Sequence, residues 1–484
     1  MQTITLAMSV DDIIGKVQNA VWGWPLIILI LAAGVWLTVR TGFVQVRHLG
    51  KALKFMVKNE DNGEGEVTSF GALCTALSAT IGTGNIVGVA TAICLGGPGA
   101  LLWMLLAAFF GMATKYSEGF LAIKYREKKD DSHYLGGPFY YIEKGMGSKW
   151  KWLAKLFAVF GICVGLFGIG TFTQINGIAT AVQDFFDPES AHVAFTLFGN
   201  DYTWATVIGG LVVTLCVALV VLGGIQRIAK VSQVIVPFMA ITYVVFALII
   251  VLGHITAIPA AVKLICQSAF DPQAALGAAT GVTIKLAMQK GIGRGIFSNE
   301  AGLGSAPIAA KTKDTVRQGL VTMTGTFIDT IVICTLTGLS IVVTGAQNAF
   351  VAGSVEGVKI TSRAWQTGLP WNGRFSAFVL MLCLAFFAFT TILGWNYYSE
   401  RCLEYLVGSQ KFTKVYRYLY ILAVFIGPYL TVAAVWNIAD ICNGLMAFPN
   451  LIALFALSGV VGKETRAYFA EKRHDLKAMA QDKK

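Results

Sequence analysis

Apolar stretches alternate with short polar connections along most of the chain. A helix that crosses a bilayer needs about 20 mostly apolar residues. At that length the pattern predicts eleven spanning helices, and therefore an all-α integral membrane protein. Their approximate ranges are 22–38, 70–95, 100–123, 156–182, 204–222, 231–252, 274–310, 320–343, 375–403, 418–436 and 441–461.

The second apolar stretch is interrupted at its centre. From Ser78 to Gly88 it reads Ser-Ala-Thr-Ile-Gly-Thr-Gly-Asn-Ile-Val-Gly, where an ordinary spanning helix would carry leucine, isoleucine and valine. Polar backbone within a bilayer is tolerated only where it is buried in protein or lines a water-filled cavity. The stretch therefore predicts a broken helix, and a break of this kind is expected to hold a ligand.

The seventh apolar stretch carries a similar interruption. Its Ile-Gly-Arg-Gly-Ile-Phe, from Ile292 to Phe297, resembles Ile-Gly-Thr-Gly-Asn-Ile, from Ile81 to Ile86. Each interrupted stretch opens a block of five predicted helices, and because five is odd the two blocks must insert in opposite senses. Paired glycine-interrupted helices in inverted repeats mark the substrate site of secondary transporters.

The chemistry expected at the first interruption follows from its backbone. Unwinding around Gly82 and Gly84 frees amides that can bind a carboxylate, assisted by the positive end of the half-helix that starts near Asn85. Freed carbonyls and the oxygens of Ser78, Thr83 and Asn85 suit a desolvated Na+.

Two further expectations concern the flanks of these interruptions. Ser298 and Asn299 are expected to cap the half-helix that follows the second one. The alternative interpretation of all these glycines is that they serve only close helix packing. For Gly88, which lies four residues after Gly84, packing is at least as good an interpretation as a ligand.

Lysine and arginine gather in alternate connections, after the first, third, fifth, seventh and ninth predicted helices and in the C-terminal tail. Such a bias marks the cytoplasmic side, so the amino terminus is expected outside and the carboxyl terminus in the cytoplasm. With only 13% charged and 55% hydrophobic residues, the net charge of +11 is accounted for by these loops. Nucleic-acid binding is therefore not expected.

Five charged residues fall inside predicted spans, where charges are costly. They are interpreted as gate salt bridges, proton-coupling groups or residues of a wet vestibule, and are left out of the substrate site. The nine cysteines show no ligand-like spacing and are expected to be buried thiols. The five charges are Glu118, Lys285, Arg294, Glu300 and Asp329.

Four motifs carry a resemblance to a known family. They are Ser-Ala-Thr-Ile-Gly-Thr-Gly-Asn-Ile-Val-Gly-Val-Ala-Thr-Ala-Ile from Ser78, Gly-Gly-Pro-Gly-Ala-Leu-Leu-Trp-Met from Gly96, Gly-Gly-Pro-Phe-Tyr-Tyr-Ile from Gly136 and Asn-Glu-Ala-Gly-Leu-Gly-Ser-Ala-Pro from Asn299. Over nearly its whole length the chain resembles the alanine or glycine:cation symporter family. The resemblance implies a leucine-transporter-type fold with one helix before two five-helix repeats. It also implies Na+-coupled uptake of small neutral amino acids, mainly alanine and glycine.

The resemblance also implies roles for single residues. Gln174 would hydrogen-bond in the pocket, although a polar residue holding two helices together is the alternative. Trp395 would form a pocket wall, although such an aromatic is more often core or interface belt. The implied substrate site comprises Gly82, Thr83, Gly84, Asn85, Gln174, Phe297, Ala301, Thr391 and Trp395, and the implied Na+ ligands are Ser78, Ile81, Asn85, Thr390 and Thr391.

These expectations divide the chain into a segment with the extra helix (1–66), a first five-helix repeat (67–255), an inverted second repeat (256–462) and a basic cytoplasmic tail (463–484). The expected protein is a multi-pass secondary transporter of the bacterial cytoplasmic (inner) membrane that imports alanine or glycine with Na+ by alternating access. Its partners are the amino acid, Na+ and the lipid bilayer, with no organic cofactor and no enzymatic activity. An ion channel, or a proton-coupled carrier of another small solute, remains the alternative.

Overall fold

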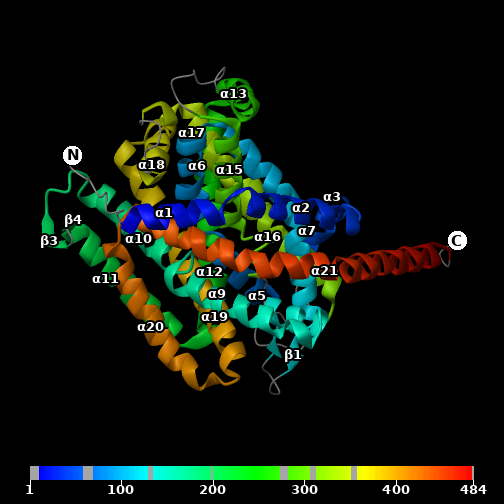
Figure 1. Cartoon of the computed structure of the whole chain (residues 1–484). Coiled ribbons are helices and arrows are strands. Elements are labelled where there is room, and N and C mark those ends of the chain that lie inside the picture. Colours follow the sequence, from blue (N-terminus) through cyan, green and yellow to red (C-terminus); the bar gives the residue numbers. More distant parts are fainter. Residues whose placement is uncertain are drawn as a thin grey trace, which may run out of the picture.

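The computed structural model describes residues 10–57, 69–128, 134–197, 200–272, 282–305, 312–349 and 357–481. This part of the chain is a bundle of helices with two short antiparallel hairpins (Figure 1). β1 (Glu127–Lys128) pairs with β2 (Tyr134–Leu135), and β3 (Val193–Leu197) pairs with β4 (Asn200–Thr203). The helical membrane class predicted from the sequence is confirmed.

The helices follow one another in two groups. The first group is α1 (Val10–Val21), α2 (Trp24–Arg40), α3 (Val44–Arg47), α4 (Leu49–Val57), α5 (Ser69–Thr80), η1 (Gly84–Gly88), α6 (Val89–Gly96), α7 (Gly99–Lys124), α8 (Pro138–Tyr140), η2 (Tyr141–Gly145), η3 (Ser148–Trp150), α9 (Lys151–Phe167), α10 (Phe172–Phe186), α11 (Trp204–Val221) and α12 (Gly224–Gly253). The second group is η4 (Ile255–Ala257), α13 (Ile258–Phe270), α15 (Ile284–Asn299), α16 (Thr315–Thr326), η6 (Phe327–Cys334), α17 (Thr335–Thr344), η7 (Ala346–Ala349), α18 (Gly357–Gly368), α19 (Gly373–Val407), η8 (Gln410–Phe412), α20 (Thr413–Ile426), η9 (Gly427–Tyr429) and α21 (Val432–Gln481).

Several helices turn apolar faces outward, as a membrane protein requires. Val234 on α12 is 71% exposed and Leu219 on α11 is 67% exposed. In the described residues, eight helical stretches are long and apolar enough to cross a bilayer, and a bent pair makes nine if it forms one span. The eight are Ile13–Arg40, Gly99–Lys124, Ser148–Phe186, Trp204–Val221, Gly224–Gly253, Thr315–Thr344, Gly373–Val407 and Val432–Glu471.

The bent pair is the interrupted stretch around Ser78 to Gly88. α5 ends at Thr80, and the chain leaves helical geometry before the π-helical turn η1 leads into α6. The segments Cys74–Thr80 and Gly84–Gly96 are bent by 42° relative to each other. The predicted first break is therefore present, and its second half begins with a π-helical turn, a feature that often marks functional sites.

The second interruption is not where the sequence predicted it. Residues 284–299 form one continuous helix, α15, so the interruption expected from Ile292 to Phe297 is wrong. The helix ends at Asn299, and the turn that follows has left-handed backbone at Glu300 (φ 56°), Gly302 (φ 96°) and Gly304 (φ 81°). Parts of the predicted span 274–310, namely 274–281 and 306–310, lie outside the described residues.

Close packing explains the glycines inside α15. A Cβ placed on Gly291 would lie 2.2 Å from the carbonyl oxygen of Ala100, and one placed on Gly295 would lie 3.0 Å from Met104 Cγ. These glycines therefore let α15 approach α7, as small residues do between membrane helices. Ser298 and Asn299 are the last residues of α15, so the expectation that they cap a following half-helix is wrong.

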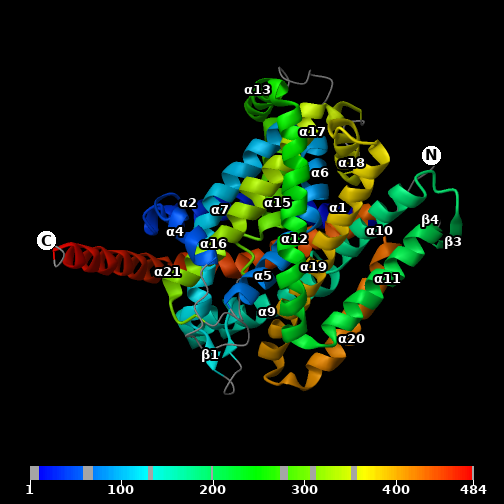
Figure 2. The ribbon, with the colours of Figure 1, turned by 180° about the vertical axis from the view of Figure 1, so that it is seen from behind.

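α15 packs antiparallel to the second half of the first break. A Cβ on Gly84 would lie 3.0 Å from Ser298 Cα, whereas a Cβ on Gly96 would lie 3.0 Å from Ala287 Cα. Residue numbers thus rise along η1 and α6 while they fall along α15. The views from both sides place α6 and α15 next to each other (Figures 1 and 2).

Two other predicted spans are divided differently. Residues 168–171 separate α9 from α10 inside the predicted span 156–182. The predicted span 418–436 crosses the end of α20 and the start of α21, because the proline-containing turn η9 stops α20 at Ile426. α21 then continues to Gln481, and its end projects from the bundle in both views (Figures 1 and 2). The predicted domain boundary at 66/67 lies outside the described residues.

Candidate functional site

Asn85 closes the first break with its own side chain. Its Oδ1 accepts a hydrogen bond from the Gly82 amide over 2.8 Å. Its Nδ2 donates to Asp329 Oδ1 over 2.6 Å and to the Asp329 carbonyl over 3.1 Å. Asn85 and Asp329 are both 0% exposed, so the break is tied to η6 in the interior of the protein.

Asp329 also joins the end of α15 to this cluster. Its Oδ2 accepts from the Ser298 hydroxyl over 2.8 Å and from the Thr330 hydroxyl over 2.7 Å. Cys334 lies beside them, with its Sγ 3.4 Å from Ser298 Oγ. A carboxylate and two hydroxyl oxygens thus converge from η6 and the end of α15, and the Asn85 side-chain amide joins them from the first break through its Nδ2. Carboxylate and hydroxyl oxygens suit a small hard cation.

Asp329 is not among the site residues predicted from the sequence, although one signal pointed to it. An acid inside an apolar span is expensive and is a functional candidate by default. Its partners could not be read from the chain, because Asn85 lies 244 residues away. Ser298 was expected as a helix cap, yet its hydroxyl bonds to this carboxylate.

Gln174, near the start of α10, lies against the first break. Its Oε1 accepts from the Thr83 amide over 3.0 Å, and its Nε2 donates to the Ile169 carbonyl over 2.9 Å. Thr83 Oγ1 is buried and has no hydrogen-bond partner in the described chain. The amides of Gly82 and Thr83 are therefore held by side chains from two different segments in this conformation.

The four residues other than Asn85 that were expected to bind Na+ are only partly brought together. Thr391 Oγ1 donates to the Ile81 carbonyl over 3.1 Å, which joins α19 to the first break. Thr390 instead bonds to the Phe386 and Phe387 carbonyls of its own helix, and Ser78 bonds to the Thr75 carbonyl of its own helix.

Aromatic side chains from three helices surround the end of α15. Phe297 packs on Trp436 of α21, with ring centroids 4.7 Å apart. Trp395 of α19 is fully buried and donates from Nε1 to Glu300 Oε1 over 2.6 Å. Ala301 lies in the turn after α15, where its methyl group approaches Gly111 of α7.

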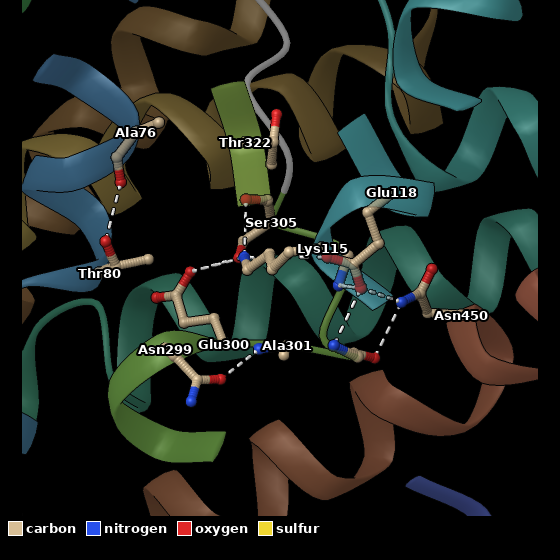
Figure 3. Close-up of polar contacts among 12 residues, drawn as sticks. Ala76, Thr80, Lys115, Glu118, Asn299, Glu300, Ala301, Ser305, Thr322 and Asn450 are labelled. Atoms are coloured by element: carbon tan, nitrogen blue, oxygen red, sulfur yellow. Dashed lines mark hydrogen bonds and ion pairs between the residues drawn. The ribbon is translucent and has the colours of Figure 1, made fainter. Parts of the chain in front are cut away.

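A cluster of charged side chains contacts that turn (Figure 3). Glu118 Oε1 accepts from the amides of Gly302 and Gly304, each over 3.0 Å, and from Asn450 Nδ2 over 2.7 Å. Lys115 Nζ lies 3.8 Å from Glu118 Oε2 and 4.0 Å from Glu300 Oε2. It also donates to Ser305 Oγ over 2.9 Å. We call this turn after α15, residues 300–304, the second break; buried polar and ionic groups connect it to α7 and α21.

Another buried ion pair lies one turn before Ser298. Arg294 contacts both carboxylate oxygens of Asp440, at 3.1 and 2.7 Å. Its guanidinium also lies over the Trp436 ring, 4.5 Å from the centroid. Gln18 of α1 donates to Asp440 Oδ2 over 3.1 Å, so the amino-terminal helix supports the pair.

The loop that contains Gly136 to Tyr141 packs into the bundle. Phe139 and Tyr141 are 0% exposed, and the Tyr141 hydroxyl donates to Asn450 Oδ1. Through Asn450 the loop reaches Glu118 and the second break.

Comparison with known proteins places this geometry in context. The profile described as the sodium:alanine symporter family matches residues 7–483. A protein described as an uncharacterized transporter of Haemophilus influenzae is 52% identical over 96% of this chain and 97% of its own. The sodium/alanine symporter AgcS of Methanococcus maripaludis is 44% identical over 97% of this chain and 100% of its own.

A solved structure matches at the level of the fold. The crystal structure of MhsT in complex with L-phenylalanine has a TM-score of 0.52 to this chain at 12% identity, and covers 84% of this chain and 99% of that one. This likeness shows that the helices are arranged as in the leucine-transporter-type fold.

Proposed function

The chain belongs to the sodium:alanine symporter family, and from this premise we propose that it imports alanine and glycine together with Na+ by alternating access. Membership makes it a Na+-coupled amino-acid symporter of the membrane and not an enzyme. The choice of alanine and glycine, and the mechanism, are the proposal.

The observation that carries the proposal is the meeting of Asn85, Ser298 and Asp329. The Ser298 hydroxyl of α15 and the Asp329 carboxylate of η6 meet the Asn85 side-chain amide of the first break, beside the Gly82 amide expected to bind the substrate carboxylate. A Na+ held there would be drawn both to Asp329 and to a carboxylate at the break. Ion and substrate would then stabilise each other, which is the thermodynamic requirement of symport.

A second Na+ is assigned to Ser78, Ile81, Thr390 and Thr391. The contact between Thr391 Oγ1 and the Ile81 carbonyl supports this assignment. Ser78 and Thr390 would complete the set by turning their hydroxyls away from the carbonyls of their own helices.

The substrate is assigned to the space next to the first break. The amides of Gly82, Thr83 and Gly84 and the start of η1 would bind its carboxylate, with Asn85 and Gln174 released from those amides. A small substrate is favoured because this region is crowded: a Cβ on Gly82 would lie 2.6 Å from Thr391 Oγ1. Phe297 and Trp395 would wall the side-chain pocket, and Ala301 would border it through its backbone.

The proposed architecture has eleven spans. α15, with 16 residues, and α20, with 14 residues, are shorter than the eight long apolar stretches, and together with these and the bent pair they bring the count to eleven. The antiparallel packing of α15 on α6 supports repeats of opposite sense. The repeats are assigned to 67–255 and 256–462, after an extra-helix segment at 1–66 and before a tail at 463–484.

The basic connections support a bacterial inner-membrane protein with its amino terminus outside and its carboxyl terminus in the cytoplasm. For alternating access, two gates are assigned to the two buried ionic clusters. One is the pair of Arg294 and Asp440, one helical turn before Ser298 on α15. The other is the cluster of Lys115, Glu118 and Glu300 at the turn that follows α15.

The test is transport by the purified protein in proteoliposomes. With an inward Na+ gradient, labelled alanine and glycine are expected to accumulate, whereas leucine and glutamine are not. Replacing Na+ by choline should abolish uptake. If uptake is unchanged by this replacement and is instead driven by an imposed proton gradient, the Na+ assignment is refuted in favour of a proton-coupled carrier.

A further inference from the structure

Asn443 of α21 is a polar residue that the proposed site does not yet use. Its side chain is 0% exposed, and neither Oδ1 nor Nδ2 has a hydrogen-bond partner in the described chain. A buried polar group left unpaired costs about 1–3 kcal/mol. Because such groups are rare in native proteins, each needs an explanation.

The face of α21 that carries Asn443 packs along the end of α15. Trp436, seven residues before Asn443, packs on Phe297. Asn450, seven residues after it, donates to the Gly302 carbonyl over 2.8 Å. Residues seven apart on a helix differ in direction by only about 20°. Asn443 therefore faces the stretch between Phe297 and Gly302.

We propose that Asn443 binds the α-ammonium group of the amino-acid substrate through its side-chain carbonyl. This inference rests on the proposed function, which assigns the substrate carboxylate to the first break. α15 ends at Asn299, so the negative end of its dipole lies in the region that Asn443 faces and favours a positive group there.

A neutral acceptor suits this position. The carboxylate of the same stretch, Glu300, already accepts from Trp395 and Ser305. Asn443 offers an acceptor oxygen without adding another negative charge to a region that already holds Glu118 and Glu300 with a single lysine, Lys115. A bound ammonium group would also donate a hydrogen bond to Asn443 Oδ1, which otherwise has no partner in the described chain.

The experiment measures the Kd of labelled alanine and of labelled glycine for the purified full-length protein in saturating Na+. Asn443→Leu removes the acceptor while filling the space, and Asn443→Asp keeps an acceptor oxygen. Loss of a hydrogen bond to a charged group is worth about 1.5–3 kcal/mol, or about 10- to 150-fold in Kd. Asn443→Leu should therefore raise both Kd values by that factor, and equally, because alanine and glycine share the ammonium group.

Asn396 provides a matched control on α19. It is 1% exposed, and both of its amide atoms also lack partners in the described chain. It follows Trp395, whose indole donates to Glu300, and one residue along a helix turns the direction by about 100°, so Asn396 does not share the direction of that contact. Asn396→Leu should leave both Kd values unchanged.

The outcomes separate this inference from the function on which it rests. Wild-type protein that binds neither amino acid in Na+ refutes the proposed function. If wild type binds and Asn443→Leu binds equally well, or loses alanine but not glycine, the inference is overturned. Should Asn443→Leu fail to fold, Asn443→Asp decides: Kd values within about threefold of wild type support the inference, and values raised beyond that overturn it.

Discussion

Asn85 and Asp329, 244 residues apart in the chain, meet through a hydrogen bond of 2.6 Å between Asn85 Nδ2 and Asp329 Oδ1. The other carboxylate oxygen of Asp329 accepts from Ser298 at the end of α15. One buried carboxylate thus joins the first break, η6 and the last turn before the second break. A cation bound there would change the hydrogen bonds of all three segments at once.

Asp329→Asn is therefore expected to weaken Na+ binding while sparing the fold. Asparagine fills the same volume and keeps one oxygen, but the negative charge that attracts the cation is lost. We expect the Na+ concentration for half-maximal alanine uptake to rise at least tenfold, corresponding to about 1.4 kcal/mol. Asp314→Asn is the matched control, because Asp314 caps α16 and asparagine caps a helix equally well. An unchanged Na+ dependence in Asp329→Asn would remove Asp329 from the ion site.

Thr391→Ala tests the second proposed Na+ site. The variant removes the hydroxyl that contacts the Ile81 carbonyl, so the Na+ concentration for half-maximal uptake should rise several-fold. Thr391→Ser keeps the hydroxyl and should behave as wild type. Thr390→Ala should have the smaller effect, because the Thr390 hydroxyl bonds to carbonyls of its own helix, whereas the Thr391 hydroxyl contacts both its own helix and the Ile81 carbonyl of the first break. An equal response of both alanine variants would contradict the asymmetry seen in the structure.

The first break could be predicted because its signal is local. Glycines, hydroxyls and an amide lie together from Ser78 to Gly88, and no apolar helix needs that combination. The contact of Gln174 with the break was also within reach, since a polar residue inside an apolar helix must find a partner. The helical membrane class follows from length and hydropathy in the same local way.

The second break was misplaced because glycine has two uses that look alike in a sequence. Gly291 and Gly295 are small so that α15 can approach α7, whereas Gly302 and Gly304 adopt positive φ in a turn. Only the neighbouring helix distinguishes the first use from the second. The convergence on Asp329 was out of reach for a related reason, since no periodicity links segments that meet only in the folded bundle.

Gly84 and Gly88 form a matched pair that tests which glycine the packing needs. A Cβ on Gly84 would lie 3.0 Å from Ser298 Cα, while a Cβ on Gly88 would meet nothing nearer than Arg294 Cδ at 3.9 Å. Gly84→Ala should therefore push η1 from α15 and reduce uptake at least tenfold, with overpacking costing about 1–3 kcal/mol of stability. Gly88→Ala should transport as wild type. The sequence had made packing at least as good an interpretation as a ligand at Gly88, and the structure gives the close contact to Gly84 instead. Loss of transport in Gly88→Ala alone would contradict this assignment.

Two substitutions of Glu118 test whether the second break needs a hydrogen-bond acceptor or a negative charge at this position. Glu118→Ala leaves the buried amides of Gly302 and Gly304 unpaired, at about 1–3 kcal/mol each, so the melting temperature in detergent should fall by several degrees. Glu118→Gln keeps an acceptor oxygen, and it leaves Lys115 with one carboxylate, Glu300, in a balanced pair. Its melting temperature should therefore stay close to that of the wild type. Glu464→Ala is the control: it removes the partner of Lys124 in a surface salt bridge and should have little effect on the melting temperature. If Glu118→Gln unfolds as early as Glu118→Ala, the charge rather than the acceptor holds the second break in place.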